Sequence, residues 1–327
     1  MNKIIQRINS NQNFVITSHI NPDGDNVGSS VAMTKFFKNL GKNPIHALED
    51  DIPENLGFLL KDHQVFKNYE DVLSHFAGES FDLIILDSAD KSRMALNSQI
   101  LEKASEVINI DHHISNNHYG SLNYILPKIS STAEVVTLIM RAIDESAIDV
   151  PVATAAYTGI STDTGNFLFP SVSADTFMAA AFLTQKGADR TLVANEIYRS
   201  TSLPLRKLTK LLLDTFTIEN QVGIMVMTQK SLEEAGVNYK DTDEVTNMAV
   251  DTKGVEVGIL IKENAKNSYR ISLRSKGKVN VCEIANLFGG GGHHNAAGCT
   301  ITGEIEEIRE TLQKLAYEQI KKDIPHA

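Results

Sequence analysis

The chain has 327 residues, which is enough for two domains of ordinary size. Its composition, 42% hydrophobic and 22% charged, is that of a folded globular protein and excludes a disordered one. The formal net charge of −10 excludes tight, indiscriminate binding to long duplexes, which requires many Lys and Arg contacts to phosphate.

The N-terminal segment MNKIIQRINSNQNFVITSHI contains no apolar run long enough for a signal peptide or a membrane span. The two cysteines, Cys282 and Cys299, cannot form a disulfide framework and are not spaced as zinc ligands. We expect both to be buried or half-buried thiols. These features predict a cytoplasmic protein.

The N-terminal part of the chain alternates apolar strands with helical segments. A buried strand at 13–17 (NFVIT) precedes a polar loop and a helical segment that closes on Gly41. The runs 81–87 (FDLIILD) and 106–111 (EVINID) are further expected strands, and each ends in aspartate. This alternation predicts an α/β domain with a doubly wound, mainly parallel sheet. Ligands of such sheets bind outside the carboxyl ends of the strands, where these aspartates stand.

The pattern becomes mostly helical from about residue 132 and changes again near residues 200–218. Ser131 and Glu134 are spaced as a capping box at the start of a helix. Later runs such as VGIMVMT and VEVGILI are β-branched strands between short helices. We expect a first domain over 1–200, a linker helix over 201–218 and a smaller α/β domain over 219–327, with the active-site cleft between the two domains.

Four stretches of the first domain place acidic and histidine side chains in loops. They contribute His19, Asp23 and Asp25 (SHINPDGD), Asp87 (ILDSAD), Asp111, His112 and His113 (DHHIS), and Asp163 (STDTG). A single aspartate after a strand is often only a helix N-cap, but all of these loops lie at one edge of the predicted sheet. Crowded carboxylates repel one another, and divalent cations relieve the repulsion. Aspartates with histidines suit Mn²⁺ or Mg²⁺ better than a sulfur-rich zinc site would.

The spacing of the carboxylates favours two ions. Asp23 and Asp25 are separated by one residue, so each can face a different ion, and Asp87 stands alone at its strand end, where it can bridge them. Two ions about 4 Å apart can hold a hydroxide between them and clamp phosphoryl oxygens during in-line displacement. The pattern therefore predicts hydrolysis of phosphate esters.

A second candidate site lies in the C-terminal part, at FGGGGHHNAAG (288–298). It follows the segment 262–278, which holds six basic residues and one acidic residue. Glycines let backbone N–H groups approach phosphate oxygens closely, and Arg274 can bind a phosphate through two hydrogen bonds. The run is not a Walker A loop, because no Lys–Ser/Thr pair follows the glycines. These features predict an anion site.

These motifs, taken in order along the chain, resemble those of the DHH phosphoesterases with the DHH-associated C-terminal domain. The resemblance covers nearly the whole chain and is strongest to the nanoRNase type, oligoribonucleases that also act as pAp phosphatases. It implies a phosphodiesterase and phosphatase that hydrolyses short 5′-phosphorylated oligonucleotides, including pApA and pGpG, to mononucleotides and converts pAp to AMP. It also implies two Mn²⁺ ions, with Mg²⁺ as the alternative. The implied partners are short single-stranded RNA or DNA and pAp, with no long duplex and no membrane.

The resemblance implies a role for each site residue. One ion would be held by His19, Asp23 and Asp87, and the other by Asp25, Asp87, His112 and Asp163. Asp111 would orient His112, and His113 would contact the scissile phosphate, so the implied catalytic set is Asp87, Asp111 and His113. The terminal phosphate and nucleotide of the substrate would be bound by Arg274, Ser275, Gly290, Gly291, Gly292 and His293. We expect Asn116 to form a turn, with contact to the site as the alternative, and Glu134 to cap a helix, with metal binding as the alternative.

Other functions stay open at this point. A RecJ-type single-strand exonuclease on longer strands would need an added oligonucleotide-binding barrel, for which the chain has no room. A pyrophosphatase or polyphosphatase would share the N-terminal motifs. A non-catalytic nucleotide sensor would bind the same substrates without turnover, and the intact ligand set argues against it. The apolar helix expected after residue 200 permits a homodimer.

Overall fold

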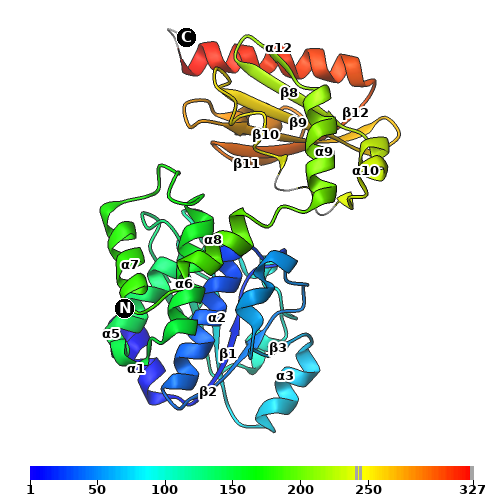
Figure 1. Cartoon of the computed structure of the whole chain (residues 1–327). Helices are drawn as coiled ribbons and strands as arrows, with labels where there is room; N and C mark the ends of the chain where they lie inside the picture. The colour runs from blue at the N-terminus through cyan, green and yellow to red at the C-terminus, as the bar shows by residue number, and fades with distance from the viewer. Residues whose placement is uncertain (240–241, 243–244, 325–327) are drawn as a thin grey trace. The chain divides into compact units, whose positions relative to one another are not determined.

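The computed structural model describes residues 1–239, 242 and 245–324. The chain divides into two compact units, Met1–Ser200 and Thr201–Ala327, and each is described by itself (Figure 1). Both units are α/β, as predicted, and each is built on a six-stranded sheet. Within the described ranges, no helix combines the length and apolar character needed to cross a membrane.

The first unit contains a parallel sheet whose strand order reverses in the middle. Its strands are β1 Asn13–Thr17, β2 Asn43–Ala47, β3 Val65–Phe66, β4 Asp82–Leu86, β5 Glu106–Asp111 and β6 Leu122–Ile125. They lie in the order β3-β2-β1-β4-β5-β6, and every neighbouring pair is parallel. The chain winds outward from β1 on one side and from β4 on the other. The carboxyl ends of β1 and β4 therefore form the point at which such sheets bind ligands.

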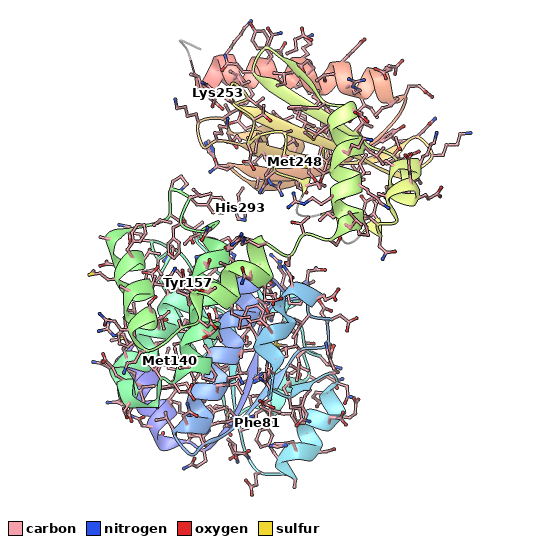
Figure 2. The ribbon with its side chains drawn as sticks, in the orientation of Figure 1. Phe81, Met140, Tyr157, Met248, Lys253 and His293 are labelled. Carbon is pink, nitrogen blue, oxygen red and sulfur yellow. The ribbon has the colours of Figure 1, made fainter. Side chains whose placement is uncertain are left out.

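Helices cover both faces of this sheet. Alternate strand residues separate two cores: Phe14 and Ile16 of β1 belong to the first and Val15 to the second. Met140 belongs to the first core and Phe81 to the second, and both are labelled in Figure 2. The first core is formed with α1 Asn2–Ser10, α2 Gly24–Asn39, the 3-10 segment η1 Glu54–Leu60, α5 Thr132–Asp144, α6 Val150–Asp163 and α7 Ala174–Gln185. The second core is formed with α3 Tyr69–Phe76 and α4 Ile100–Lys103, and α8 Arg190–Tyr198 follows α7.

Helices α2 and α6 approach each other at two glycines. A Cβ built at Gly28 would lie 2.6 Å from a backbone carbonyl oxygen of α6. A Cβ built at Gly159 would lie 2.5 Å from the Cβ of Ala133 and 2.8 Å from Oδ1 of Asp25. Real Cβ atoms do not approach other atoms so closely, so this helix contact requires glycine. The contact fixes the spacing between Asp25, in the first turn of α2, and Asp163, the last residue of α6.

The second unit contains a mixed sheet. Its strands are β7 Thr217–Glu219, β8 Val222–Met227, β9 Val257–Ala265, β10 Ser268–Ser275, β11 Gly291–His293 and β12 Ala296–Thr302. They lie in the order β11-β12-β10-β9-β8-β7, and only the β8–β9 pair of these is parallel. The predicted fold class, a doubly wound parallel sheet followed by a smaller α/β domain, is confirmed.

Helices pack on both faces of the second sheet. One face packs on α11 Val281–Asn286 and α12 Ile305–Asp323, and the long α12 is visible across this unit in Figure 1. The other face packs on α9 Leu203–Asp214 and α10 Gln229–Ala235. Helix α9 lies in the stretch where we expected a linker helix, and its Leu205, Leu208 and Leu212 are buried against this sheet.

We expect Gly159→Ala to destabilise the protein by about 1–3 kcal/mol, because the added methyl group overlaps the Cβ of Ala133 and Oδ1 of Asp25. Gly57→Ala in the same unit is the matched control, since a Cβ there would meet nothing within 4 Å. Urea unfolding followed by circular dichroism measures both. Equal unfolding midpoints for the two variants would contradict the proposed tightness of the α2–α6 contact.

Candidate metal centre

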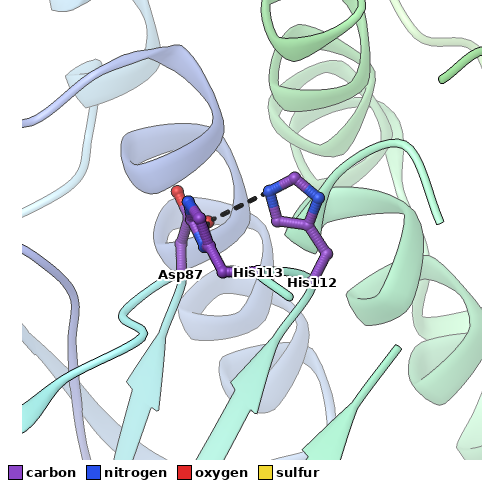
Figure 3. A group of neighbouring side chains, drawn as sticks. All are labelled: Asp87, His112 and His113. Carbon is purple, nitrogen blue, oxygen red and sulfur yellow. Dashed lines mark ion pairs between the residues drawn. The ribbon is translucent and has the colours of Figure 1, made fainter. Parts of the chain in front are cut away.

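Asp87 lies at the centre of the group of side chains beyond the sheet. It follows β4, while His112 and His113 follow β5, the next strand of the sheet (Figure 3). One carboxylate oxygen of Asp87 lies 3.7 Å from Nε2 of His112 and 3.6 Å from Nδ1 of His113. The other lies 3.4 Å from Nε2 of His19, which follows β1. A single buried carboxylate therefore faces histidines from both neighbouring strands.

The backbone of Asp87 is held in an uncommon conformation. Its φ is +54°, in the left-handed region that non-glycine residues rarely adopt. Its N–H donates to the carbonyl of Ile110 over 3.0 Å, and its Oδ1 accepts from Oγ1 of Thr132 over 2.9 Å. Such backbone strain persists only where the surroundings enforce it, and it is concentrated at functional sites.

Two histidines present the same nitrogen to the carboxylates. Nδ1 of His19 lies 2.7 Å from the carbonyl of Ile20, and Nδ1 of His112 lies 3.3 Å from the carbonyl of Ile129. A carbonyl oxygen can only accept, so Nδ1 carries the proton in each ring. Nε2 of each ring therefore faces the carboxylates, and Nε2 of His112 lies 3.3 Å from Oδ2 of Asp163. Histidines that bind metals are fixed in this way by a hydrogen bond from the other nitrogen.

Asp25 is bound by the start of a helix that is distant in sequence. Its two carboxylate oxygens accept from the backbone N–H groups of Thr132 and Ala133, over 2.6 and 2.8 Å. These are the unpaired N–H groups of the first turn of α5, where the helix dipole also favours an anion. The side chain of Asp25 is almost completely buried, at 2% exposure. Asp23 lies two residues earlier, is exposed, and caps α2 by accepting from the N–H groups of Asp25 and Asn26.

The structure brings together all six residues that we expected to hold metal ions. Three groups have ligand atoms within 4.8 Å of one another: His19, Asp23 and Asp87; Asp87, His112 and His113; and Asp25, His112 and Asp163. The first group coincides with the expected ligands of one ion. The third supplies three of the four expected ligands of the other. Their role as ligands stays a prediction.

The electrostatics of these side chains fit divalent cations. Burial and the charges of Asp87 and Asp163 raise the pKa of Asp25 well above its usual value. Burial raises the pKa of Asp163 to about 7, and repulsion from Asp87 and Asp23 adds to this effect. Although burial opposes charge on His19, hydrogen bonds with Asp23 and Asp87 raise its pKa to about 10. The carboxylates of this set repel one another, and Mn²⁺ or Mg²⁺, which bind oxygen and imidazole ligands, can neutralise them.

The expected role of Asp111 is corrected by the structure. We expected Asp111 to orient the ring of His112, but it bonds only the backbone N–H of His112, over 2.8 Å. Its Oδ1 accepts from Nδ1 of His113 over 2.7 Å, while the ring of His112 is held by the carbonyl of Ile129. Because β5 continues to Asp111, the ring of His113, two residues later, turns back toward the carboxylate of Asp111, and the ring of His112 does not.

Asn116 both forms a turn and contacts the site, although the sequence favoured the turn alone. We expected it to form a turn, and its Oδ1 does accept from the N–H of His118 over 2.7 Å. Its Nδ2 also donates to Oδ2 of Asp111 over 2.6 Å and to Oδ1 of Asn109 over 2.8 Å, and Asn116 is buried. The side-chain amide of Asn116 therefore fixes the carboxylate of Asp111, which in turn holds the ring of His113. An asparagine in a polar loop carries no sequence signal for this role.

Glu134 is not part of the metal-candidate groups. Ser131 caps α5 by accepting from the N–H of Glu134 over 3.1 Å. The reciprocal bond of a capping box is replaced, because Oε2 of Glu134 accepts from Oγ of Ser130 and Oγ1 of Thr176, over 2.6 and 3.0 Å. Glu134 therefore joins α5 to the start of α7.

The second unit places two of the expected substrate-binding side chains in one row. Arg274 of β10 and His293 of β11 both lie opposite Ala296 of β12. Residues directly opposite share a face, so Arg274 and His293 lie on the same face, about 10 Å apart. Ser275 is on the other face by alternation, and its Oγ donates to the carbonyl of Val279 over 2.6 Å. The structure therefore does not bring the hydroxyl of Ser275 into this row.

Two of the glycines beside this row, Gly290 and Gly292, are required by close backbone packing. A Cβ at Gly290 would lie 2.2 Å from the carbonyl oxygen of Gly298, and a Cβ at Gly292 would lie 2.4 Å from that of Ala296. Gly291 pairs with Gly298 in the edge strand β11. Gly291, Gly292 and His293 of the edge strand β11 are exposed, whereas Arg274, Ala296 and Gly290 are half-buried. Exposed glycine backbone can approach an anion closely.

We expect Asp111→Asn to lower the pKa of His113. Burial opposes charge on His113, but the hydrogen bond to Asp111 raises the pKa of its ring, so removing the negative charge of Asp111 lowers this pKa. Titration of the histidine ring protons by NMR in chelated protein measures this. Asp51→Asn is the control, since Asp51 is exposed, and an unchanged pKa of His113 in Asp111→Asn would contradict the assigned contact.

We expect the chelated protein to lose stability as the pH rises. The folded pKa values of Asp25 and Asp163 lie above the unfolded value of 3.8, so the folded state binds more protons and stability falls as the pH rises from about 4 through about 7. His19, with a folded pKa of about 10, stabilises fully below 6.5 and loses this contribution as the pH rises through 10. Tm should therefore be lower at about pH 8.5 than at about pH 6, and Mn²⁺ should raise it more at the higher pH. A Tm that rises with pH without metal would contradict this account of the cluster.

Comparison with known proteins gives the family. Residues 13–160 match the DHH family, N-terminal domain, and residues 220–321 match the DHHA1 domain. The bifunctional oligoribonuclease and PAP phosphatase NrnA of Thermus thermophilus is 30% identical over 92% of this chain and 91% of its own length. The protein of the same name from Bacillus subtilis is 25% identical over 97% of this chain and 98% of its own.

A solved structure shows the same fold. The crystal structure of an exopolyphosphatase-related protein from Bacteroides fragilis has a TM-score of 0.85 at 24% identity, covering 98% of this chain and 97% of that one. The strand ends that carry Asp87 and the Asp111–His113 triplet lie within the matched DHH segment. The chain belongs to the DHH family, carries a DHHA1 domain in its second unit, and is a phosphoester hydrolase.

Proposed function

We propose that this enzyme hydrolyses short 5′-phosphorylated oligonucleotides to mononucleotides and removes the 3′-phosphate of pAp. The observation that carries the proposal is the position of Asp87, whose two oxygens face His19 on one side and His112 on the other. This is the arrangement that a carboxylate shared by two cations requires. Relatives that match over nearly the whole chain are named for both activities, which supports the substrate class.

Two divalent cations, Mn²⁺ or Mg²⁺, would complete the site. We propose that one is held by His19, Asp23 and Asp87, and the other by Asp25, Asp87, His112 and Asp163. Cations in such sites place positive charge on the phosphoryl oxygens and lower the pKa of a water molecule.

The remaining residues act on the substrate directly or hold those that do. His113 would contact the scissile phosphate through Nε2, since its Nδ1 is occupied by Asp111. The hydrogen bond to Asp111 raises the pKa of His113, although burial opposes this, so the ring is disposed to donate a proton to an anionic oxygen. Asn116 keeps the carboxylate of Asp111 in place by its 2.6 Å hydrogen bond.

We propose that residues 1–200 form the catalytic domain and residues 219–327 the substrate-binding domain. In the latter, Arg274 and His293, with the glycines of β11, would bind the terminal phosphate of the substrate. The net charge of −10 offers no long basic surface for an extended strand, which favours substrates of a few nucleotides.

The direct test is kcat/KM with Mn²⁺ on pAp, on a 5′-phosphorylated dinucleotide and on an RNA of about 24 nucleotides. We expect the dinucleotide to be the best substrate, pAp the second and the long RNA poor, with all activity lost in EDTA. Equal or better cleavage of the long RNA would contradict the length limit and favour a processive exonuclease. Turnover of polyphosphate alone would contradict the nucleotide substrate.

We expect Arg274→Ala to raise KM for the phosphorylated dinucleotide by about 10-fold or more and to change kcat little, because a charge-assisted contact to phosphate is lost. Arg270→Ala is the matched control, since Arg270 lies on the same strand and the same face but opposite Thr300. Steady-state kinetics of both variants measure this. An unchanged KM in Arg274→Ala would remove this residue from the phosphate site.

A further inference from the structure

Immediately after Asp163 the chain turns through three consecutive left-handed residues. Gly165, Asn166 and Phe167 have φ values of +56°, +57° and +64°. Glycine and asparagine adopt this conformation readily, but a bulky residue such as Phe167 does so only when its surroundings enforce it. We call residues 164–169 the aromatic hook.

Hydrogen bonds to the end of α6 hold the aromatic hook. The N–H of Asn166 donates to a carbonyl of α6 over 2.7 Å, and the N–H groups of Leu168 and Phe169 donate to the carbonyl of Thr164 over 3.0 and 3.1 Å. Thr164 is completely buried, and its Oγ1 accepts from the N–H of Phe167 over 3.0 Å. The strained backbone is therefore fixed to the helix that ends in a candidate metal ligand.

The two rings of the hook have different surroundings. Phe167 stacks on Phe177 of α7, with ring centroids 5.4 Å apart and planes 17° apart. Phe169 lies over Gly165, where a Cβ would be 2.6 Å from two of its ring atoms and 2.9 Å from a third. Phe169 nevertheless stays 48% exposed. The hook thus packs one half-buried ring, Phe167, against the protein and presents the other, Phe169, to solvent.

The hook starts beside the candidate metal centre. Asp163 directly precedes it and has its Oδ2 3.3 Å from Nε2 of His112. Thr162 packs so closely on the first turn of α2 that a Cβ at Gly24 would lie 2.3 Å from its Oγ1. Gly24 lies between two of the expected ligand residues. The start of the hook is therefore tied to both candidate ion sites.

We propose that Phe169 forms a stacking subsite for a nucleobase of the substrate, next to the metal centre. The inference rests on the proposed function and adds the side chain that binds the base. Every nucleobase has a flat π face, so an exposed aromatic ring beside a phosphate site binds nucleotides without selecting one base. The subsite should favour short oligonucleotides of any sequence over substrates that lack bases.

Packing against a second copy of the chain is the competing use of this surface. Phe177 and Met178 of α7 are 55% and 59% exposed, and Phe177 stacks on Phe167 of the hook. A self-association surface would not require the strained turn that follows Asp163. The strain is located where the chain leaves the metal centre, which favours a role in the site.

The test is kcat/KM with Mn²⁺ on 5′-phosphorylated diadenylate and on two analogues, each of which lacks one of the two bases. Phe169→Ala should lower kcat/KM on diadenylate by about 10- to 100-fold. It should leave kcat/KM unchanged on one of the two analogues, the one that lacks the base that stacks on Phe169. Phe177→Ala removes a similarly exposed ring from α7 and should change none of these values. Phe169→Tyr keeps a ring and should behave as the wild type.

Each other result overturns the inference. Loss by the same factor on all three substrates, or no loss on any, would show that Phe169 does not stack on a base. A change from dimer to monomer in both alanine variants during sedimentation, without a base-dependent loss, would assign the surface to self-association. If the wild-type enzyme is inactive on all three substrates, the proposed function itself is contradicted. If the wild-type enzyme is active but its kcat/KM does not respond to Phe169→Ala, only the stacking subsite is contradicted.

Discussion

Repulsion among carboxylates buried at one edge of the first sheet is the constraint on which the rest of the site depends. Burial, together with the charges of Asp87 and Asp163, raises the pKa of Asp25 well above its usual value, and burial with neighbouring charges raises that of Asp163 to about 7. The protein compensates this repulsion only in part. The helix α5 gives Asp25 two backbone N–H groups, and Thr132 gives Asp87 a hydroxyl. The remaining charge is what divalent cations would neutralise.

The fold keeps these charges together through the strand order, the helix packing and the backbone conformation around them. The strand-order reversal between β1 and β4 puts the residues after these strands side by side. Gly28 and Gly159 let α2 and α6 approach until Asp25 lies against α5. The left-handed backbone of Asp87 turns its carboxylate between the histidines of two neighbouring strands. Tight packing, and not flexibility, sets the spacing of the cluster.

The parts of the site that sequence could predict are those encoded locally. An apolar strand followed by aspartate is a local pattern, and it was enough to place Asp87 and Asp111 at the binding edge of a parallel sheet. The contacts of Asp25 with Thr132 and Ala133 could not be predicted, because they join backbone groups more than a hundred residues apart. The predicted partner of Asp111, the ring of His112, was wrong, because the orientation of the two rings after Asp111 depends on where the strand ends. The left-handed backbone of Phe167 also lacks a local signal, since it goes with hydrogen bonds of the hook to buried Thr164.

The most direct test of the central claim is the number of Mn²⁺ ions bound per chain, measured by electron paramagnetic resonance during titration. The account predicts two ions in the wild type, with magnetic coupling between them, because one carboxylate is shared. In Asp87→Asn the coupling should disappear and at least one ion should bind much more weakly. A single uncoupled ion in the wild type, or two ions with unchanged affinity and coupling in Asp87→Asn, would contradict the assignment of Asp87 as the shared ligand.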